Sequence, residues 1–128
     1  MIVVCTGSRT WTDESQIKEK LLELQNEFDS LSVVVGYDPH KKTPKGVDRM
    51  VYKWCKALGI HVVCEPADWD SKGYFNRGAG MERNILMLEK YEPNLVVAFR
   101  AKGKSNGTDH CIKEARKRHI PVQLNNER

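Results

Sequence analysis

The chain has 128 residues and carries 21 Lys and Arg against 17 Asp and Glu, which gives a formal net charge of +4. Its 40% of hydrophobic residues suffices for one packed core, but no run approaches the roughly 20 apolar residues that a transmembrane helix needs. The N-terminus starts on an apolar run without a basic segment. We therefore expect a cytoplasmic protein without a membrane-spanning helix.

Five short apolar runs alternate with helical patterns along the chain. They are four or five residues long and rich in β-branched side chains, which is typical of strands buried on both faces of a parallel sheet. The predicted strands cover residues 2–6, 31–35, 60–64, 95–99 and 120–124.

Four helical patterns fill the gaps between these runs. The first follows an N-cap at Thr12 or Asp13, and the second ends at a C-cap glycine, Gly59. The third and fourth are expected over about residues 81–91 and 108–119. The first two carry apolar stripes that we expect to face the core: Ile17, Leu21, Leu24 and Phe28, and Val47, Met50, Val51, Trp54 and Leu58.

This alternation predicts an α/β fold made of a single domain over residues 1–128. The expected architecture has three layers, a parallel five-stranded sheet with helices on both faces, joined by right-handed crossovers. The cysteines form no CxxC motif and the histidines have no zinc spacing, so the sequence indicates neither a zinc ribbon nor a disulfide framework. We expect no metal and no cofactor.

Glycines and polar side chains follow the first, second and fourth strands. Ligands of open parallel sheets bind beyond the carboxyl ends of the strands, where glycines let the backbone approach an anion and helix N-termini offer free N–H groups. We predict a phosphate site there, with Arg9 and Lys104 completing it. The alternative is that these segments are ordinary strand-to-helix turns. The three segments that follow these strands are Gly7-Ser8-Arg9, Gly46-Val47-Asp48-Arg49 and Gly103-Lys104-Ser105-Asn106-Gly107-Thr108.

The start of the third predicted helix adds three polar residues to the same edge. Arg83 could clamp a phosphate or carboxylate, and Glu82 could act as a general base if burial raised its pKa. Alternatively, Glu82 only complements the helix dipole. Asn84 is expected to line the same pocket.

The order of five motifs resembles the YspA-related branch of the SLOG superfamily, which groups the Smf/DprA and LONELY GUY Rossmann-like domains. The motifs are Gly7-Ser8-Arg9, Gly46-Val47-Asp48-Arg49, Pro66-Ala67-Asp68-Trp69, Gly78 to Asn84 and Ser105-Asn106-Gly107-Thr108. The resemblance spans residues 2–122. It implies a sheet ordered 3-2-1-4-5, a nucleotide or nucleotide-derived ligand, and a homo-oligomer, with a dimer favoured.

From the loops and the resemblance together we assign the site. Asp48 would accept a hydrogen bond from a ribose hydroxyl and Trp69 would stack on a base. Arg83 and Glu82 would be catalytic if the chain is an enzyme. The full set of predicted ligand-binding residues is Gly7, Ser8, Arg9, Gly46, Asp48, Arg49, Trp69, Asn84, Lys104, Ser105, Gly107 and Thr108.

Three functions stay open. LONELY GUY enzymes are phosphoribohydrolases with a catalytic Glu, but Cys111 stands at that position here, so Asp109 or Glu82 would have to replace it. The leading hypothesis is therefore a sensor or sequestering protein for a nucleotide-like ligand. The alternative is hydrolysis of an N-glycosidic bond in a nucleoside phosphate or an ADP-ribose-like compound.

The third function follows from charge. Residues 98–128 hold eight basic and three acidic side chains, so a single-stranded DNA-binding module like the DprA relatives is a weaker alternative. The basic residues of the last helix could equally form a solvated face, and the three tryptophans are not interleaved with them. The loop from Tyr37 to Lys45 adds three lysines, which either cover a bound phosphate or form a surface insertion.

Overall fold

The computed structural model describes residues 1–40, 46–68 and 78–128, and in these ranges strands and helices alternate strictly. All strands pair in parallel in one five-stranded sheet, in the order β3-β2-β1-β4-β5. The predicted α/β class and the strand order 3-2-1-4-5 are confirmed. In chain order the elements are β1 (Ile2–Gly7), α1 (Glu14–Glu27), β2 (Ser32–Val35), α2 (Val47–Leu58), β3 (His61–Cys64), α3 (Ala79–Tyr91), β4 (Leu95–Arg100), α4 (Asn106–Lys117) and β5 (Val122–Asn126).

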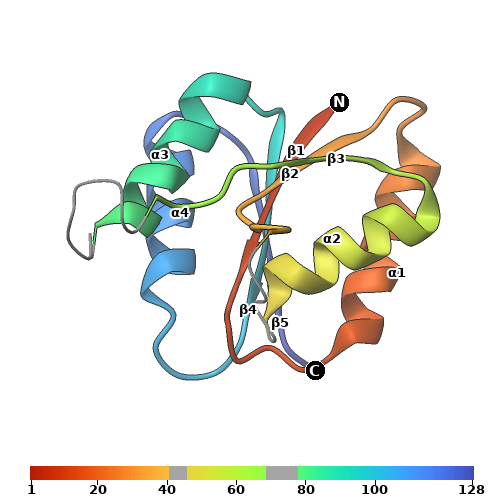
Figure 1. Ribbon diagram of the computed structural model, residues 1–128, viewed down its shortest axis with the longest axis horizontal. Helices are drawn as coiled ribbons and strands as arrows, with labels where there is room; N and C mark the ends of the chain where they lie inside the picture. The colour runs from red at the N-terminus through yellow and green to blue at the C-terminus, as the bar shows by residue number, and fades with distance from the viewer. Residues whose placement is uncertain (41–45, 69–77) are drawn as a thin grey trace.

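Helices cover both faces of this sheet, as predicted. Figure 1 shows α1 and α2 on one side of the strands and α3 and α4 on the other. Along β1, Val3 and Cys5 pack in the cluster under α1 and α2, whereas Val4 packs under α3 and α4. Because successive strand residues point to opposite faces and both faces are covered, the strand must be apolar throughout. None of the described helices is both long and apolar enough to cross a membrane.

The helix ends follow local chemistry, and the end of α4 shifts the predicted boundary between the last helix and the last strand. Asp13 caps α1 by accepting from the backbone N–H of Gln16 at 3.1 Å, and Gly59 ends α2 with φ 71°, both as predicted. A residue in the left-handed backbone conformation also ends α4, but here it is His119, with φ 59°, and not a glycine. The N–H of Ile120 then donates to Ala115 O at 3.0 Å, which closes the helix and delays β5 to Val122.

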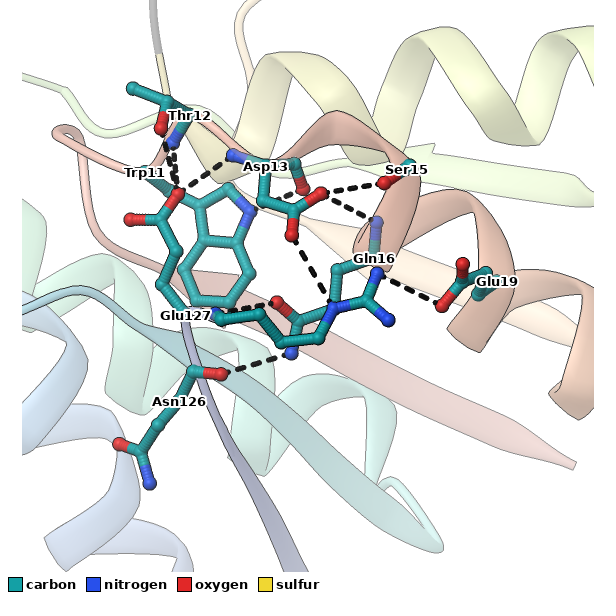
Figure 2. A network of polar contacts seen from close by, with 9 residues as sticks. Trp11, Thr12, Asp13, Ser15, Gln16, Glu19, Asn126 and Glu127 are labelled. Carbon is teal, nitrogen blue, oxygen red and sulfur yellow. Dashed lines mark hydrogen bonds and ion pairs between the residues drawn. The ribbon is translucent and has the colours of Figure 1, made fainter.

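The C-terminal tail, Asn126–Arg128, is fastened to the start of α1 (Figure 2). One carboxylate oxygen of Glu127 accepts from Thr12 N at 2.6 Å, from Thr12 Oγ1 at 2.9 Å and from Asp13 N at 2.7 Å. Gln16 Nε2 donates to Asn126 O at 2.9 Å. We call these contacts the tail latch. It joins β5 to the segment between β1 and α1, which carries Arg9.

The tail latch makes folding stability depend on pH. Burial alone would raise the pKa of Glu127, but the N–H groups of Thr12 and Asp13 and the Thr12 hydroxyl lower it below its ordinary value of 4.5. The charged form therefore stabilises the fold above this value, and the contribution is lost as the pH falls through the folded-state pKa. We expect Glu127→Gln to lower the free energy of unfolding by about 1 kcal/mol near neutral pH.

Urea unfolding at about pH 7 and about pH 3 tests this latch. The difference between wild type and Glu127→Gln should shrink at the lower pH, because the stabilisation by charged Glu127 is lost as the pH falls toward and through its lowered pKa. Glu27→Gln is the matched control, since Glu27 is exposed at the end of α1 and forms no ion pair within the described ranges. Equal effects of the two substitutions would contradict the latch.

Candidate functional site

The carboxyl ends of β1 and β4 meet at a buried junction built on Ser8. The Ser8 N–H donates to Phe99 O at 3.0 Å, and Ser8 Oγ accepts from Ala101 N at 3.0 Å. The same hydroxyl lies 2.7 Å from Ser105 Oγ, and Ser8 and Ser105 are 4% and 9% exposed. The first and last of the segments that were predicted to bind phosphate are thus neighbours, with Ser8 and Ser105 bonded to each other.

Two glycines let α2 begin against this junction. A Cβ on Gly7 would lie 2.5–2.6 Å from Cβ and Cγ1 of Val47, and Gly46 adopts φ 103° with Arg9 Cα 3.0 Å from the place of its missing Cβ. Ser8 O accepts from Val47 N at 3.3 Å, so it bonds the first N–H of the helix. Packing therefore accounts for both glycines, and it places Asp48 in the first turn of α2 beside the end of β1.

Arg83 and Asn84 of α3 reach across the same edge. Arg83 Nη1 donates to Gly36 O at 2.8 Å, directly after β2, and its Nε donates to Asn84 Oδ1 at 3.2 Å. Asn84 is 1% exposed, and its Nδ2 donates to Gly107 O at 3.0 Å and lies 3.4 Å from His110 Nδ1. Asn84 thus joins α3 to the first turn of α4 while it orients Arg83.

Asp48 is the carboxylate of this edge with a perturbed pKa. It is half-buried as a residue, and burial of its carboxyl raises its pKa above the ordinary value of 3.8. The positive charges of Arg83 and Arg9 oppose this rise, which shows that both guanidinium groups act on the same carboxyl. Asp48, Arg83 and Arg9 come from three different elements or loops, and the fold brings them within electrostatic range of one another.

Cys111 cannot replace the catalytic Glu of LONELY GUY enzymes. The residue is fully buried, and burial raises the pKa of its thiol to about 11. The charge of Arg83 and a hydrogen bond from Thr6 lower this pKa, but burial has the larger effect. A thiol with this pKa is neutral at physiological pH and is neither a general base nor a nucleophile. Its neighbour Thr108 is 3% exposed, so its side chain belongs to the same interior layer.

Other predicted site residues lie at the surface of this edge. Arg49, Lys104 and Gly107 are exposed, and no atom lies within 4 Å of a Cβ built on Gly107. Glu82 is exposed as well, so the burial on which its role as a general base depended is not observed. Trp69 lies outside the described residues, as do positions 41–45 of the loop that begins at Tyr37. The described residues contain no group of three His, Cys, Asp or Glu placed to hold a metal ion.

Two contributors to the edge were not among the site residues assigned from the sequence: Gly36, although it directly follows the second predicted strand, and His110. A Cβ on Gly36 would lie 2.5 Å from Cζ of Arg83, so this position must be glycine for the guanidinium to lie on the strand end. A glycine directly after a predicted strand was the available signal, but nothing local connected it to a helix 47 residues away. His110 shows no spacing signal, because its partner Asn84 belongs to another helix.

Comparison with known proteins now fits this geometry. The family model described as "YspA, cpYpsA-related SLOG family" matches residues 1–71, more than half of the chain. The chain belongs to this SLOG family. The gene 61 protein of Mycobacterium phage D29 is 35% identical over 126 residues, an alignment that covers 94% of this chain and 92% of that protein. The predicted resemblance to the YspA-related SLOG branch is confirmed, and membership in the SLOG family suggests a nucleotide-related ligand.

Substitution by alanine should change the free energy of unfolding differently at Gly7 and at Gly107, two glycines of the carboxyl edge. Gly7→Ala forces a Cβ into the branched side chain of Val47, and we expect a loss of about 2 kcal/mol in the free energy of unfolding. Gly107→Ala meets open space in the first turn of α4, so stability should be unchanged or rise by up to about 1 kcal/mol. Urea unfolding of the two variants measures both effects, and a costly Gly107→Ala would contradict the open approach to this helix end.

Proposed function

We propose that residues 1–128 form one domain that binds a nucleotide or nucleotide-derived small molecule at the carboxyl edge of the sheet, as a sensor or sequestering protein. One observation carries the proposal. The Arg83 guanidinium is held between Gly36 O and Asn84 Oδ1, in electrostatic range of Asp48 and next to the first turn of α4. A guanidinium pre-oriented by two acceptors retains N–H donors for a phosphate at little entropic cost.

The start of α4 supplies the second half of the proposed phosphate site. Ser105 makes no side-chain cap hydrogen bond to the helix, because its hydroxyl is bonded to Ser8. The first N–H groups of α4, at Gly107 and Thr108, are therefore left to a ligand, with the positive end of the helix dipole behind them. Lys104 is exposed just before this turn. Asp48, across the edge, would accept from a ribose hydroxyl.

Native mass spectrometry of the purified protein, followed by titration with AMP, ADP and ADP-ribose, tests the proposal. We expect Arg83→Ala and Gly36→Ala each to weaken binding by at least about tenfold, because the Gly36 substitution displaces the guanidinium without removing it. Arg116→Ala is the matched control, an exposed arginine on the flank of α4. The proposal fails if no compound of the panel binds, or if Gly36→Ala binds as well as Arg116→Ala.

A second candidate function is hydrolysis of an N-glycosidic bond, and the raised pKa of Asp48 favours it. A carboxyl that holds its proton to a higher pH can donate that proton to the leaving base as the C1′–N bond breaks. Water then adds to C1′ of the ribose, and the proton that it loses returns to the Asp48 carboxylate. In this scheme Arg83 binds the phosphate of the substrate. Asp48 would thus be the catalytic carboxyl, in place of Glu82 or Asp109, which the sequence suggested as replacements for the catalytic Glu; Asp109 instead pairs with Arg100 at 2.8 Å.

Product analysis by mass spectrometry, after incubation with AMP and ADP-ribose, tests this second function. If Asp48 donates the proton, Asp48→Asn should lower turnover by at least about a hundredfold and Glu82→Gln by less than about twofold. The rate should fall as the pH rises through the raised pKa of Asp48, because the deprotonated carboxyl cannot donate. Turnover that survives in Asp48→Asn would overturn this assignment, and absence of turnover with retained binding would leave only the binding function.

A further inference from the structure

A second surface lies along the flank of α4, between α4 and β5, and reaches the carboxyl edge of the sheet at Arg100 and Asp109. A hollow of about 590 Å³ opens there. Its apolar part consists of Ile112, which is 6% exposed, and Leu124, which is 45% exposed and among the most exposed large apolar side chains of the described chain. Its polar lining consists of Arg100, Asp109, Lys113, Arg116 and Lys117.

Only part of the positive charge around this hollow is neutralised. Arg100 Nε bonds Asp109 Oδ1 at 2.8 Å, and Lys117 Nζ lies 3.2 Å from Glu114 Oε2. Lys113 and Arg116 are exposed and form no ion pair among the residues that the structure describes. Two cations one helical turn apart therefore stand beside an exposed leucine.

The outer edge of β5 adds unpaired backbone groups to the same place. The N–H of Glu127 donates to Arg100 O at 3.3 Å, and the carbonyl of Pro121 accepts from Val96 N at 2.9 Å, so the odd-numbered residues direct their backbone groups toward β4. Strand geometry then directs the N–H and C=O of Val122 and Leu124 outward. Neither charge nor proline, the usual protection of a sheet edge, occurs in residues 122–126.

We propose that this face docks an acidic, extended peptide segment of a partner protein, which pairs with β5 as a sixth strand. One aliphatic side chain of the segment would contact Leu124 and Ile112. Acidic side chains two residues before and after it lie on the same face of the added strand, because strand side chains alternate, and they would meet Lys113 and Arg116. The proposal concerns a different surface from the carboxyl-edge site and does not depend on it.

The observations favour a peptide over two other occupants. A single-stranded nucleic acid would match the cations, but among the described residues no aromatic side chain lines the hollow for base stacking, and bases would leave the β5 edge unpaired. A second copy that pairs β5 with β5 across a two-fold axis would bring Lys113 and Arg116 toward the same residues of the other copy, and like charges then repel. An added acidic strand would contact Leu124, place its carboxylates near Lys113 and Arg116, and hydrogen-bond the outer edge of β5.

Fluorescence anisotropy with a labelled peptide, Thr-Glu-Thr-Leu-Thr-Glu-Thr, tests the docking surface, with Gln in place of both Glu as the control peptide. We expect the acidic peptide to bind, and Arg116→Glu to weaken it at least about tenfold. Lys56→Glu makes the same charge change on an exposed position of α2 and should leave the affinity within about twofold. Hydrogen exchange should show new protection of the amides of Val122 and Leu124 when the peptide is bound.

Three results would overturn the proposal. The first is no peptide binding, or binding that Arg116→Glu and Lys56→Glu change equally. The second is a labelled oligo-thymidine that binds more tightly than the peptide and loses affinity in Arg116→Glu, which would assign the surface to nucleic acid. The third is a dimer in sedimentation velocity whose β5 amides are already protected without peptide, which would assign it to a second copy of the chain.

Discussion

The hydrogen bonds of Ser8 are the constraint on which the carboxyl edge depends. Its N–H and hydroxyl bond the end of β4 through Phe99 and Ala101, its hydroxyl bonds Ser105 at the start of α4, and its carbonyl bonds Val47 at the start of α2. One buried residue thus sets where two helices begin relative to the central strands. A buried hydroxyl without hydrogen-bond partners costs about 1–3 kcal/mol, so arrangements that separate the Ser8 hydroxyl from its partners are disfavoured and one arrangement of the junction is favoured.

This arrangement explains the chemistry of the edge. When α2 begins against Ser8, Asp48 in its first turn is enclosed, and burial raises its pKa even though Arg83 and Arg9 favour its charged form. When α4 begins at Ser105, its first turn lies against Asn84, which holds Arg83. A carboxyl with a raised pKa and an oriented guanidinium therefore follow from the same backbone junction. In the structure the N–H, hydroxyl and carbonyl of Ser8 hold this junction together, and its predicted contact with a ligand stays a prediction.

How much of this could be predicted depends on the range of each signal. The strands were predicted from local pattern, since a strand such as β1, buried on both faces, must be apolar at each position. The strand order came from the family resemblance, and the helix end at Gly59 from a local conformational need. His119 in the same left-handed role carries no such signal, because a non-glycine residue adopts this conformation only when the structure around it demands it.

Long-range contacts account for the remainder. The contact of Arg83 with Gly36 O and the tail latch at Glu127 each join segments far apart in the chain, and composition or periodicity cannot pair them. Asp48 was expected to bind ribose, but its enclosure depends on how α2 meets β1, which is a tertiary property. Residues near one strand end were therefore predicted as a group, whereas their individual roles required the structure.

The net charge of the chain also has a clearer meaning once the ion pairs are known. Four of the eight basic residues after residue 97 form ion pairs with carboxylates: Arg100, Lys117, Arg118 and Arg128. The pair of Lys117 lies within α4, and the other three join different segments of the chain. Of the others, Lys102 and Lys104 precede α4 at the carboxyl edge, and Lys113 and Arg116 lie on the flank of the same helix. The positive field thus has two separate sources, about a helix length apart in sequence. One helix can therefore present an anion site at its N-terminus and a second, independent cationic surface along its side, because the first depends on backbone N–H groups and the second on side chains.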